Sequence, residues 1–158
     1  MIEILIKSVL GEPRYQDQIV YFSVPGEPLD ADLAIDDKRR QAPNKAKAMA
    51  VIGDVKGKIA IILDDMVDTA GTLTEATYAI VDKGAKEIHA CCAHPVLSGE
   101  SVERLANSPL KTIVVSDTIP LNSKAAACDK IRVLSVADLI GEAIIRSHKG
   151  DSVTSLFV

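Results

Sequence analysis

Two adjacent carboxylates and a hydroxyl-rich loop stand together near the middle of the sequence. The apolar run 59–63 predicts a buried strand, and it stops abruptly on Asp64 and Asp65. Small and hydroxyl residues follow at 68–72, just before a helical pattern. The free N–H groups of a helix start bind phosphate, whereas carboxylates suit the hydroxyls of a sugar. The predicted ligand is a phosphorylated sugar, and the candidate binding residues are Asp64, Asp65, Asp68, Thr69, Ala70, Gly71 and Thr72.

The helix after this loop has its own sequence signals. Thr72 and Glu75 have the spacing of a capping box, and Gly84 is placed to end the helix. An Asp pair at the end of a strand is also found in receiver and phosphotransfer domains. The pair by itself therefore leaves the sugar-phosphate interpretation and that alternative open.

From residue 58 onward, strand and helix patterns alternate. The apolar stripe that ends at Ile144 predicts a final amphipathic helix. Such alternation predicts an α/β domain with a mostly parallel sheet flanked by helices, with ligands at the carboxyl ends of the strands. The predicted strands are 58–63, 86–93, 112–115 and 131–134, and the helical segments are 73–83, 98–107 and 136–144.

The first 57 residues are less regular. Segments 18–24 and 31–35 read as strands, but only about six residues separate them, fewer than a parallel crossover needs. Either the two strands are antiparallel or a crossover has been lost. Gly53, Gly57 and Lys58 fall one residue short of a P-loop spacing, so we interpret this stretch as a hairpin turn.

Composition excludes several classes of function. The chain has 158 residues, of which 47% are hydrophobic and only 3% aromatic, and its net charge is −4. Few aromatics and a negative charge argue against nucleic-acid binding. Residues 1–10 are too short and too charged for a signal peptide or a membrane span. Cys91, Cys92 and Cys128 lack metal spacing and read as reduced thiols of a cytoplasmic protein.

A basic segment at 37–45 is the second chemical feature. An isolated charge run is usually a solvated loop. Beside a phosphate site, however, Lys and Arg on a mobile loop can close over a polyphosphate and neutralise charge in the transition state.

The apolar content of so short a chain also leads us to expect a homo-oligomer.

The loop with its Asp-Asp-Met, Asp-Thr and Gly-Thr steps resembles the signature loop of the type I phosphoribosyltransferase fold, in the form of the ribose-phosphate pyrophosphokinase (PRPP synthetase) family. Segments 37–55, 94–99, 114–120 and 152–157 look like further family stretches. The resemblance covers residues 33–158 and is to the family's C-terminal domain. We therefore expect a single phosphoribosyltransferase-like domain over 1–158, with an atypical segment at 1–32.

The resemblance also implies roles for residues. Asp64 and Asp65 would hold ribose hydroxyls, and residues 68–72 would hold the 5-phosphate. Lys38 and Arg40 would be catalytic, acting on the triphosphate of ATP, the co-substrate that enters with Mg²⁺. The tail residues implied to bind a regulatory phosphate are Ser152, Val153, Thr154 and Phe157.

Three functions remain open. The first is pyrophosphoryl transfer from ATP to ribose 5-phosphate, expected to be incomplete in this chain because the family's ATP-binding residues are not visible here. The second is a non-catalytic phosphate-binding or assembly module, like the regulatory paralogues of that enzyme. The third is a type I phosphoribosyltransferase, which would need a hood that selects a nucleobase.

Overall fold

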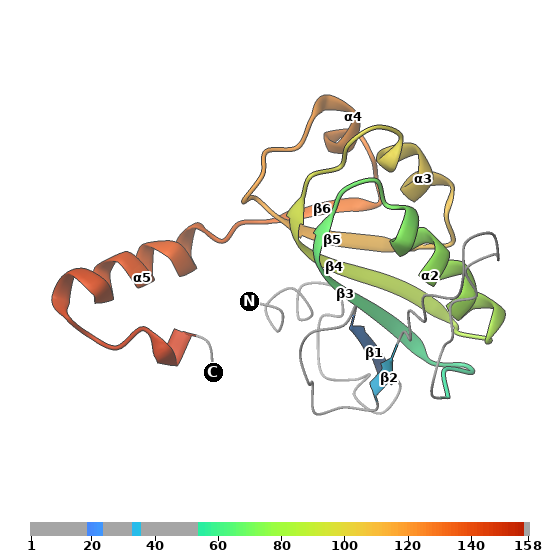
Figure 1. Cartoon of the computed structure of the whole chain (residues 1–158), viewed down its shortest axis with the longest axis horizontal. Coiled ribbons are helices and arrows are strands. Elements are labelled where there is room, and N and C mark those ends of the chain that lie inside the picture. Colours follow the sequence, from blue (N-terminus) through green and yellow to red (C-terminus); the bar gives the residue numbers. More distant parts are fainter. Residues whose placement is uncertain (1–18, 24–32, 36–53, 157–158) are drawn as a thin grey trace, which may run out of the picture.

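A parallel sheet organises the chain (Figure 1). The computed structural model describes residues 19–23, 33–35 and 54–156. The strand order is β2-β1-β3-β4-β5-β6, and every neighbouring pair is parallel. The predicted α/β fold with a mostly parallel sheet is confirmed. The strands are β1 (Ile19–Ser23), β2 (Leu33–Ile35), β3 (Ile59–Val67), β4 (Glu87–Pro95), β5 (Thr112–Ser116) and β6 (Ile131–Leu134).

Strands β1 and β2 correct two expectations about the N-terminal region. Tyr21 of β1 is in register with Leu33 of β2 and with Ile61 of β3, and both pairings are parallel. The antiparallel alternative is therefore wrong. A tight turn precedes β3, with Lys58 N donating to Val55 O at 3.0 Å. Because β3 has a parallel neighbour on each side, this turn does not lead into a hairpin.

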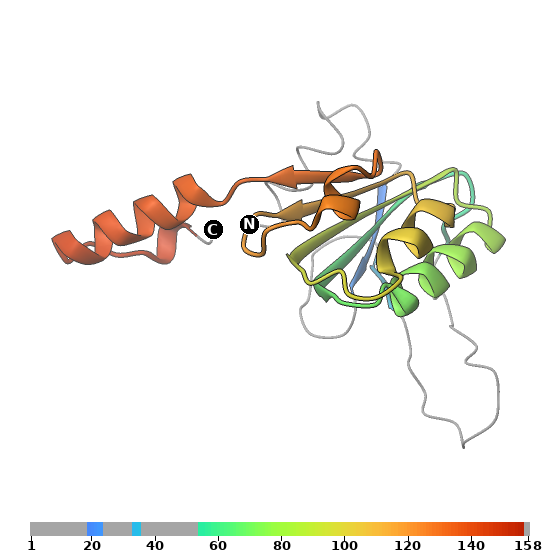
Figure 2. The ribbon, with the colours of Figure 1, turned by 90° about the horizontal axis from the view of Figure 1, so that it is seen from above.

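Helices pack on one face of the sheet, as seen from above in Figure 2. They are α2 (Gly71–Asp82), α3 (Ser101–Asn107) and the short α4 (Ser123–Ala126). Alternate strand residues such as Ala60, Ile62 and Ala90 form a core with Leu73 and Ile80 of α2. Side chains of a strand alternate between faces, so this parity fixes which residues of β3 look toward α2.

Strand β3 is longer than its apolar run predicts. It continues to Val67, so Asp64 and Asp65 lie inside the strand and not after it. The reason is the neighbouring strand, because β4 reaches Pro95 and pairs with β3 along this whole stretch. Backbone pairing does not depend on side-chain polarity, and the apolar pattern ends earlier only because the strand end reaches the surface.

The last helix, α5 (Ala137–Lys149), projects away from the sheet beyond β6 (Figure 1). The predicted amphipathic helix is confirmed, yet none of its residues is buried. Ile140 is 52% exposed and Ile144 is 63% exposed. The stripe therefore has no partner among the described elements. None of the helices within the described ranges is long and apolar enough to cross a membrane.

Candidate functional site

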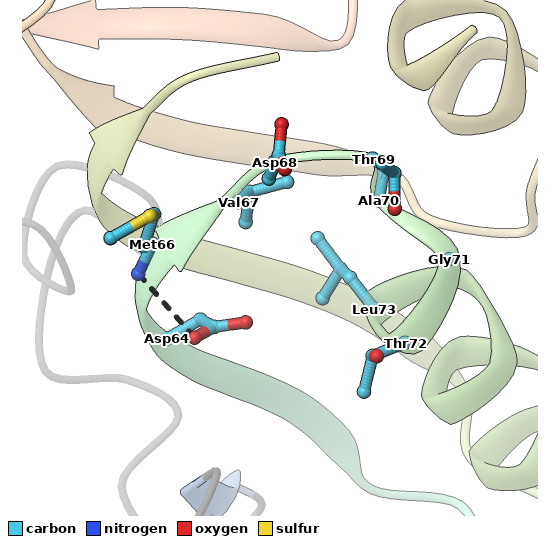
Figure 3. A pocket seen from close by; sticks show the side chains of 9 residues that line it. All are labelled: Asp64, Met66, Val67, Asp68, Thr69, Ala70, Gly71, Thr72 and Leu73. Atoms are coloured by element: carbon cyan, nitrogen blue, oxygen red, sulfur yellow. Dashed lines mark hydrogen bonds between the residues drawn. The ribbon is translucent and has the colours of Figure 1, made fainter. Parts of the chain in front are cut away.

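A pocket of about 220 Å³ opens where β3 ends and α2 begins (Figure 3). It contains every predicted ligand residue except Asp65. The cluster thus joins one carboxylate of the strand, the connecting loop and the first turn of a helix. The lining residues are Asp64, Met66, Val67, Asp68, Thr69, Ala70, Gly71, Thr72 and Leu73.

The pleat of β3 separates the two adjacent carboxylates. Asp64 has the parity of Ile62, which packs in the core beneath the helices, and its side chain is half-buried. Asp65 is exposed and, by the alternation of the strand, points to the other face. The Asp64 carboxylate accepts a hydrogen bond from Met66 N at 3.4 Å. Of this pair, Asp64 is therefore the carboxylate that lines the pocket.

The start of α2 is not closed by a side chain. Its N-cap is Ala70, in the left-handed region at φ 58°, with no side-chain cap hydrogen bond. The predicted capping box of Thr72 and Glu75 is therefore wrong, because Thr72 is already inside the helix. The first N–H groups of a helix lack intrahelical acceptors. Here they belong to residues 71–73, which line the pocket and suit an anion.

The hydroxyl of Thr74 fixes the backbone behind these N–H groups. Its Oγ1 donates to Ala70 O at 2.9 Å and to Gly71 O at 3.0 Å. The side chain is buried beneath the first turn. A left-handed conformation at a residue with a Cβ costs roughly 1–2 kcal/mol, so the surrounding contacts must hold Ala70 in place.

Two residues that sequence reasoning did not assign to the site support the loop from outside. Ser98 Oγ donates to Asp68 Oδ1, and Ser98 N donates to Asp68 O at 3.0 Å. Arg104 Nη1 donates to Thr69 O at 3.3 Å. Both supporting residues lie in the next β–α unit, about thirty positions along the chain, so no local spacing could have indicated them.

The neighbouring strand ends carry a second polar network. His94 Nδ1 lies 2.9 Å from Thr118 Oγ1, and Thr118 Oγ1 donates to Ala93 O at 2.9 Å. His94 is exposed at the end of β4. The pKa of Asp117 lies below its usual range because the Ser135 hydroxyl and the Val136 N–H donate to its carboxylate.

The thiols next to the site are inert. Cys128 is free and only partly buried, whereas Cys91 and Cys92 are free and buried. Burial raises the pKa of both to about 12, so neither is a thiolate near neutral pH. Within the described ranges no three His, Cys, Asp or Glu side chains come together as metal ligands.

The remaining predicted residues lie elsewhere. Lys38 and Arg40, as well as Phe157, fall outside the described residues. Ser152, Val153 and Thr154 follow α5 and do not line the pocket. Arg146 of α5 holds this tail, with Nη1 donating to Ser152 O at 3.3 Å. The described structure therefore brings together the predicted sugar-phosphate residues other than Asp65, and the tail residues lie outside this pocket.

The fold agrees with comparisons to known proteins. The sequence model of the family described as phosphoribosyl synthetase-associated domain matches residues 10–158. The chain belongs to this family. It is 56% identical over 131 residues to a ribose-phosphate pyrophosphokinase of Caldanaerobacter subterraneus subsp. tengcongensis, covering 83% of this chain and 41% of that protein. A Bordetella pertussis protein of the same name is 55% identical over 129 residues, covering 82% of this chain and 42% of its own length.

Among solved structures, this chain is similar to phosphoribosylpyrophosphate synthetase from Mycobacterium smegmatis. The TM-score is 0.73 at 29% sequence identity, over 92% of this chain and 50% of that chain. The resemblance to the ribose-phosphate pyrophosphokinase family is confirmed. The chain spans about two fifths of the length of the curated relatives it matches.

Proposed function

We propose that this domain binds ribose 5-phosphate in the pocket at the end of β3, as the acceptor site of a ribose-phosphate pyrophosphokinase. The observation that carries the proposal is the combination of Asp64 and the uncapped start of α2 in one pocket. A phosphate needs hydrogen-bond donors and a sugar needs acceptors for its hydroxyls. This pocket offers both, at opposite ends.

Each part of the ligand has a place in this proposal. The N–H groups of residues 71–73 and the hydroxyls of Thr69 and Thr72 bind the 5-phosphate, aided by the helix dipole. The Asp64 carboxylate accepts hydrogen bonds from the ribose hydroxyls. Val67 and Leu73 are buried and line the same pocket, where they supply apolar contacts (Figure 3). The sugar is thereby oriented with its C1 hydroxyl available for reaction.

In the proposed reaction, the C1 oxygen attacks the β-phosphorus of ATP and AMP leaves. The attacking hydroxyl releases its proton to solvent, and the bond between the β-phosphorus and the bridging oxygen breaks, so that AMP leaves with that oxygen. Lys38 and Arg40 are proposed to neutralise the charge on the transferred group. Mg²⁺ is proposed to enter with ATP, since Mg²⁺ commonly binds through substrate phosphates. We assign no step to it, because the described residues form no cluster of metal ligands.

The proposal includes incomplete activity of the 158-residue chain. All residues that line the pocket of about 220 Å³ belong to the segment 64–73, so the described pocket supplies an acceptor site and no basic side chain for a triphosphate. In-line transfer requires donor and acceptor to be aligned, and an error of about 1 Å can cost on the order of a hundredfold in rate. The second candidate function, a non-catalytic phosphate-binding module, would use the same uncapped start of α2. A cytoplasmic location is part of the proposal, supported by the free core thiols.

The phosphate site can be tested with threonine variants. Thr69→Val combined with Thr72→Val should weaken binding of inorganic phosphate and of ribose 5-phosphate in calorimetry. The loss should be a few kcal/mol at most, because hydrogen bonds to charged groups contribute about 1.5–3 kcal/mol each. Thr112→Val, at the start of β5 and outside the pocket lining, is the matched control. Equal affinity of the double variant and the control would sink the assignment.

The two carboxylates should behave differently. Asp64→Asn should remove the preference for ribose 5-phosphate over inorganic phosphate, because it weakens the acceptor for the sugar hydroxyls. Asp65→Asn should keep that preference, since Asp65 does not line the pocket. Competition calorimetry with both ligands measures the ratio of affinities. A preference lost only in Asp65→Asn would mean that the sugar lies on the other face of β3.

Turnover tests whether the chain carries a complete active site. Incubation of the 158-residue chain with Mg-ATP and ribose 5-phosphate should yield little or no AMP and PRPP, although the chain binds the sugar phosphate. Chromatographic assay of both products measures this directly. Stoichiometric formation of AMP and PRPP, abolished by Lys38→Ala, would show instead that the chain carries a complete active site.

We also propose that the chain forms a homo-oligomer, supported by the exposed Ile140 and Ile144 on α5. Exposed apolar stripes of this kind are covered in stable assemblies. Light scattering at tens of micromolar should show an oligomer that Ile144→Asp weakens. Lys149→Asp, near the end of the same helix, is the control and should leave the mass unchanged. A monomeric wild-type chain would refute the proposal.

A further inference from the structure

We propose that Ser98 is a positioning residue of the phosphate site, where its hydroxyl holds the Asp68 carboxylate away from the start of α2. This inference rests on the proposed function, because it concerns how the same pocket stays open to an anion. Ser98 does not line the pocket. It acts through Asp68, which does.

The need for such a residue follows from the loop itself. Asp68 lies two positions before Ala70, the N-cap of α2. A carboxylate at this distance from a helix start can accept hydrogen bonds from the first N–H groups, as Asp does in N-caps. It would then occupy the donors that a phosphate requires and would also repel the phosphate. An Asp68 side chain that is free to move would therefore compete with phosphate for the first N–H groups of α2.

The geometry shows how the competitor is restrained. Ser98 Oγ donates to Asp68 Oδ1, and the main chain of Ser98 donates to Asp68 O at 3.0 Å. Leu97 N donates to Val67 O at 3.0 Å, so the two segments run together over two residues. In Figure 3 the Asp68 side chain points away from Asp64. The Ser98 hydroxyl thus holds the Asp68 carboxylate toward the loop that follows β4.

The backbone at Ser98 is arranged for this contact. Leu97 has a φ of 48°, in the left-handed region, although it carries a branched side chain that is 3% exposed. Such a conformation is costly and persists only where neighbouring contacts enforce it. It directs the chain so that both the N–H and the hydroxyl of Ser98 reach Asp68.

Arg104 supports the loop without Ser98, so the effect of the Ser98 hydroxyl on Asp68 can be measured by itself. Its Nη1 donates to Thr69 O at 3.3 Å, independently of Ser98. The backbone bonds of Leu97 and Ser98 also remain when the hydroxyl is removed. Loss of the hydroxyl should therefore release the carboxylate while the loop keeps its path.

The test is a double-mutant cycle read by calorimetry with inorganic phosphate and, separately, with ribose 5-phosphate. Ser98→Ala should weaken phosphate binding roughly tenfold, because a charged group is freed beside the site. Ser98→Thr, which keeps the hydroxyl, should bind within about threefold of the wild-type chain. The pair Ser98→Ala and Asp68→Asn should recover most of the lost affinity, since the repelling charge is gone. Ser123→Ala, exposed on α4, is the matched control.

Each result of the double-mutant cycle either supports or overturns the role of Ser98. If Ser98→Ala binds phosphate as the wild-type chain does, the inference is overturned while the proposed function stands. If the loss persists in the pair with Asp68→Asn, Ser98 supports the loop structurally and does not restrain a charge. Should Ser98→Ala fail to fold, Ser98→Cys, with its weak donor, provides the same comparison. A wild-type chain that binds neither ligand overturns the proposed function and this inference together.

Discussion

The parallel pairing between β3 and β4 is the interaction on which the pocket depends. It runs from Ile59 and Glu87 to Val67 and Pro95, so both strands end at the same level. The loops that follow them then lie side by side and exchange hydrogen bonds, from Leu97 to Val67 and from Ser98 to Asp68. A shorter β4 would leave the loop at 68–70 without this neighbour.

Burial of the helix face sets the second constraint. Leu73 and Ile80 pack into the same core as Ala60 and Ile62, which fixes α2 over β3. The start of the helix is thereby held near Asp64, although the Asp64 carboxylate repels the kind of anion that the helix start attracts. The two can share one ligand only if it carries hydroxyls at one end and phosphate at the other. A sugar phosphate satisfies this condition.

The C-terminal helix α5 differs from the other described helices in its packing. Up to β6 every helix within the described ranges has residues in the core, whereas α5 has none. Its own contacts are local, such as Arg146 with Glu142 at 2.7 Å and with the tail. Amphipathic helices gain most of their stability from packing of the apolar face. An α5 with its stripe exposed therefore points to further contacts beyond those of the described fold, consistent with the proposed assembly.

The sequence by itself determined most of the architecture. The apolar runs of β3 to β6 and the stripe of α5 were visible as periodicity, because burial on one face or two leaves a direct pattern in residue type. The loop 68–72 was visible for a similar reason, since small and hydroxyl residues before a helix have few other uses. The family resemblance followed from the same loop, and the comparisons confirm it.

Only the tertiary structure decided the rest, because it depends on partners distant in sequence. The extent of β3 beyond Leu63 was set by β4, and the parallel direction of β1 by its pairing with both neighbours. The pleat separated Asp64 from Asp65, although adjacent acids look equivalent in a sequence. The capping box failed because α2 begins at Gly71, after a left-handed Ala70, which puts Thr72 inside the first turn. Ser98 contacts Asp68 only in the folded chain, and the sequence of 68–72 gives no sign of this contact.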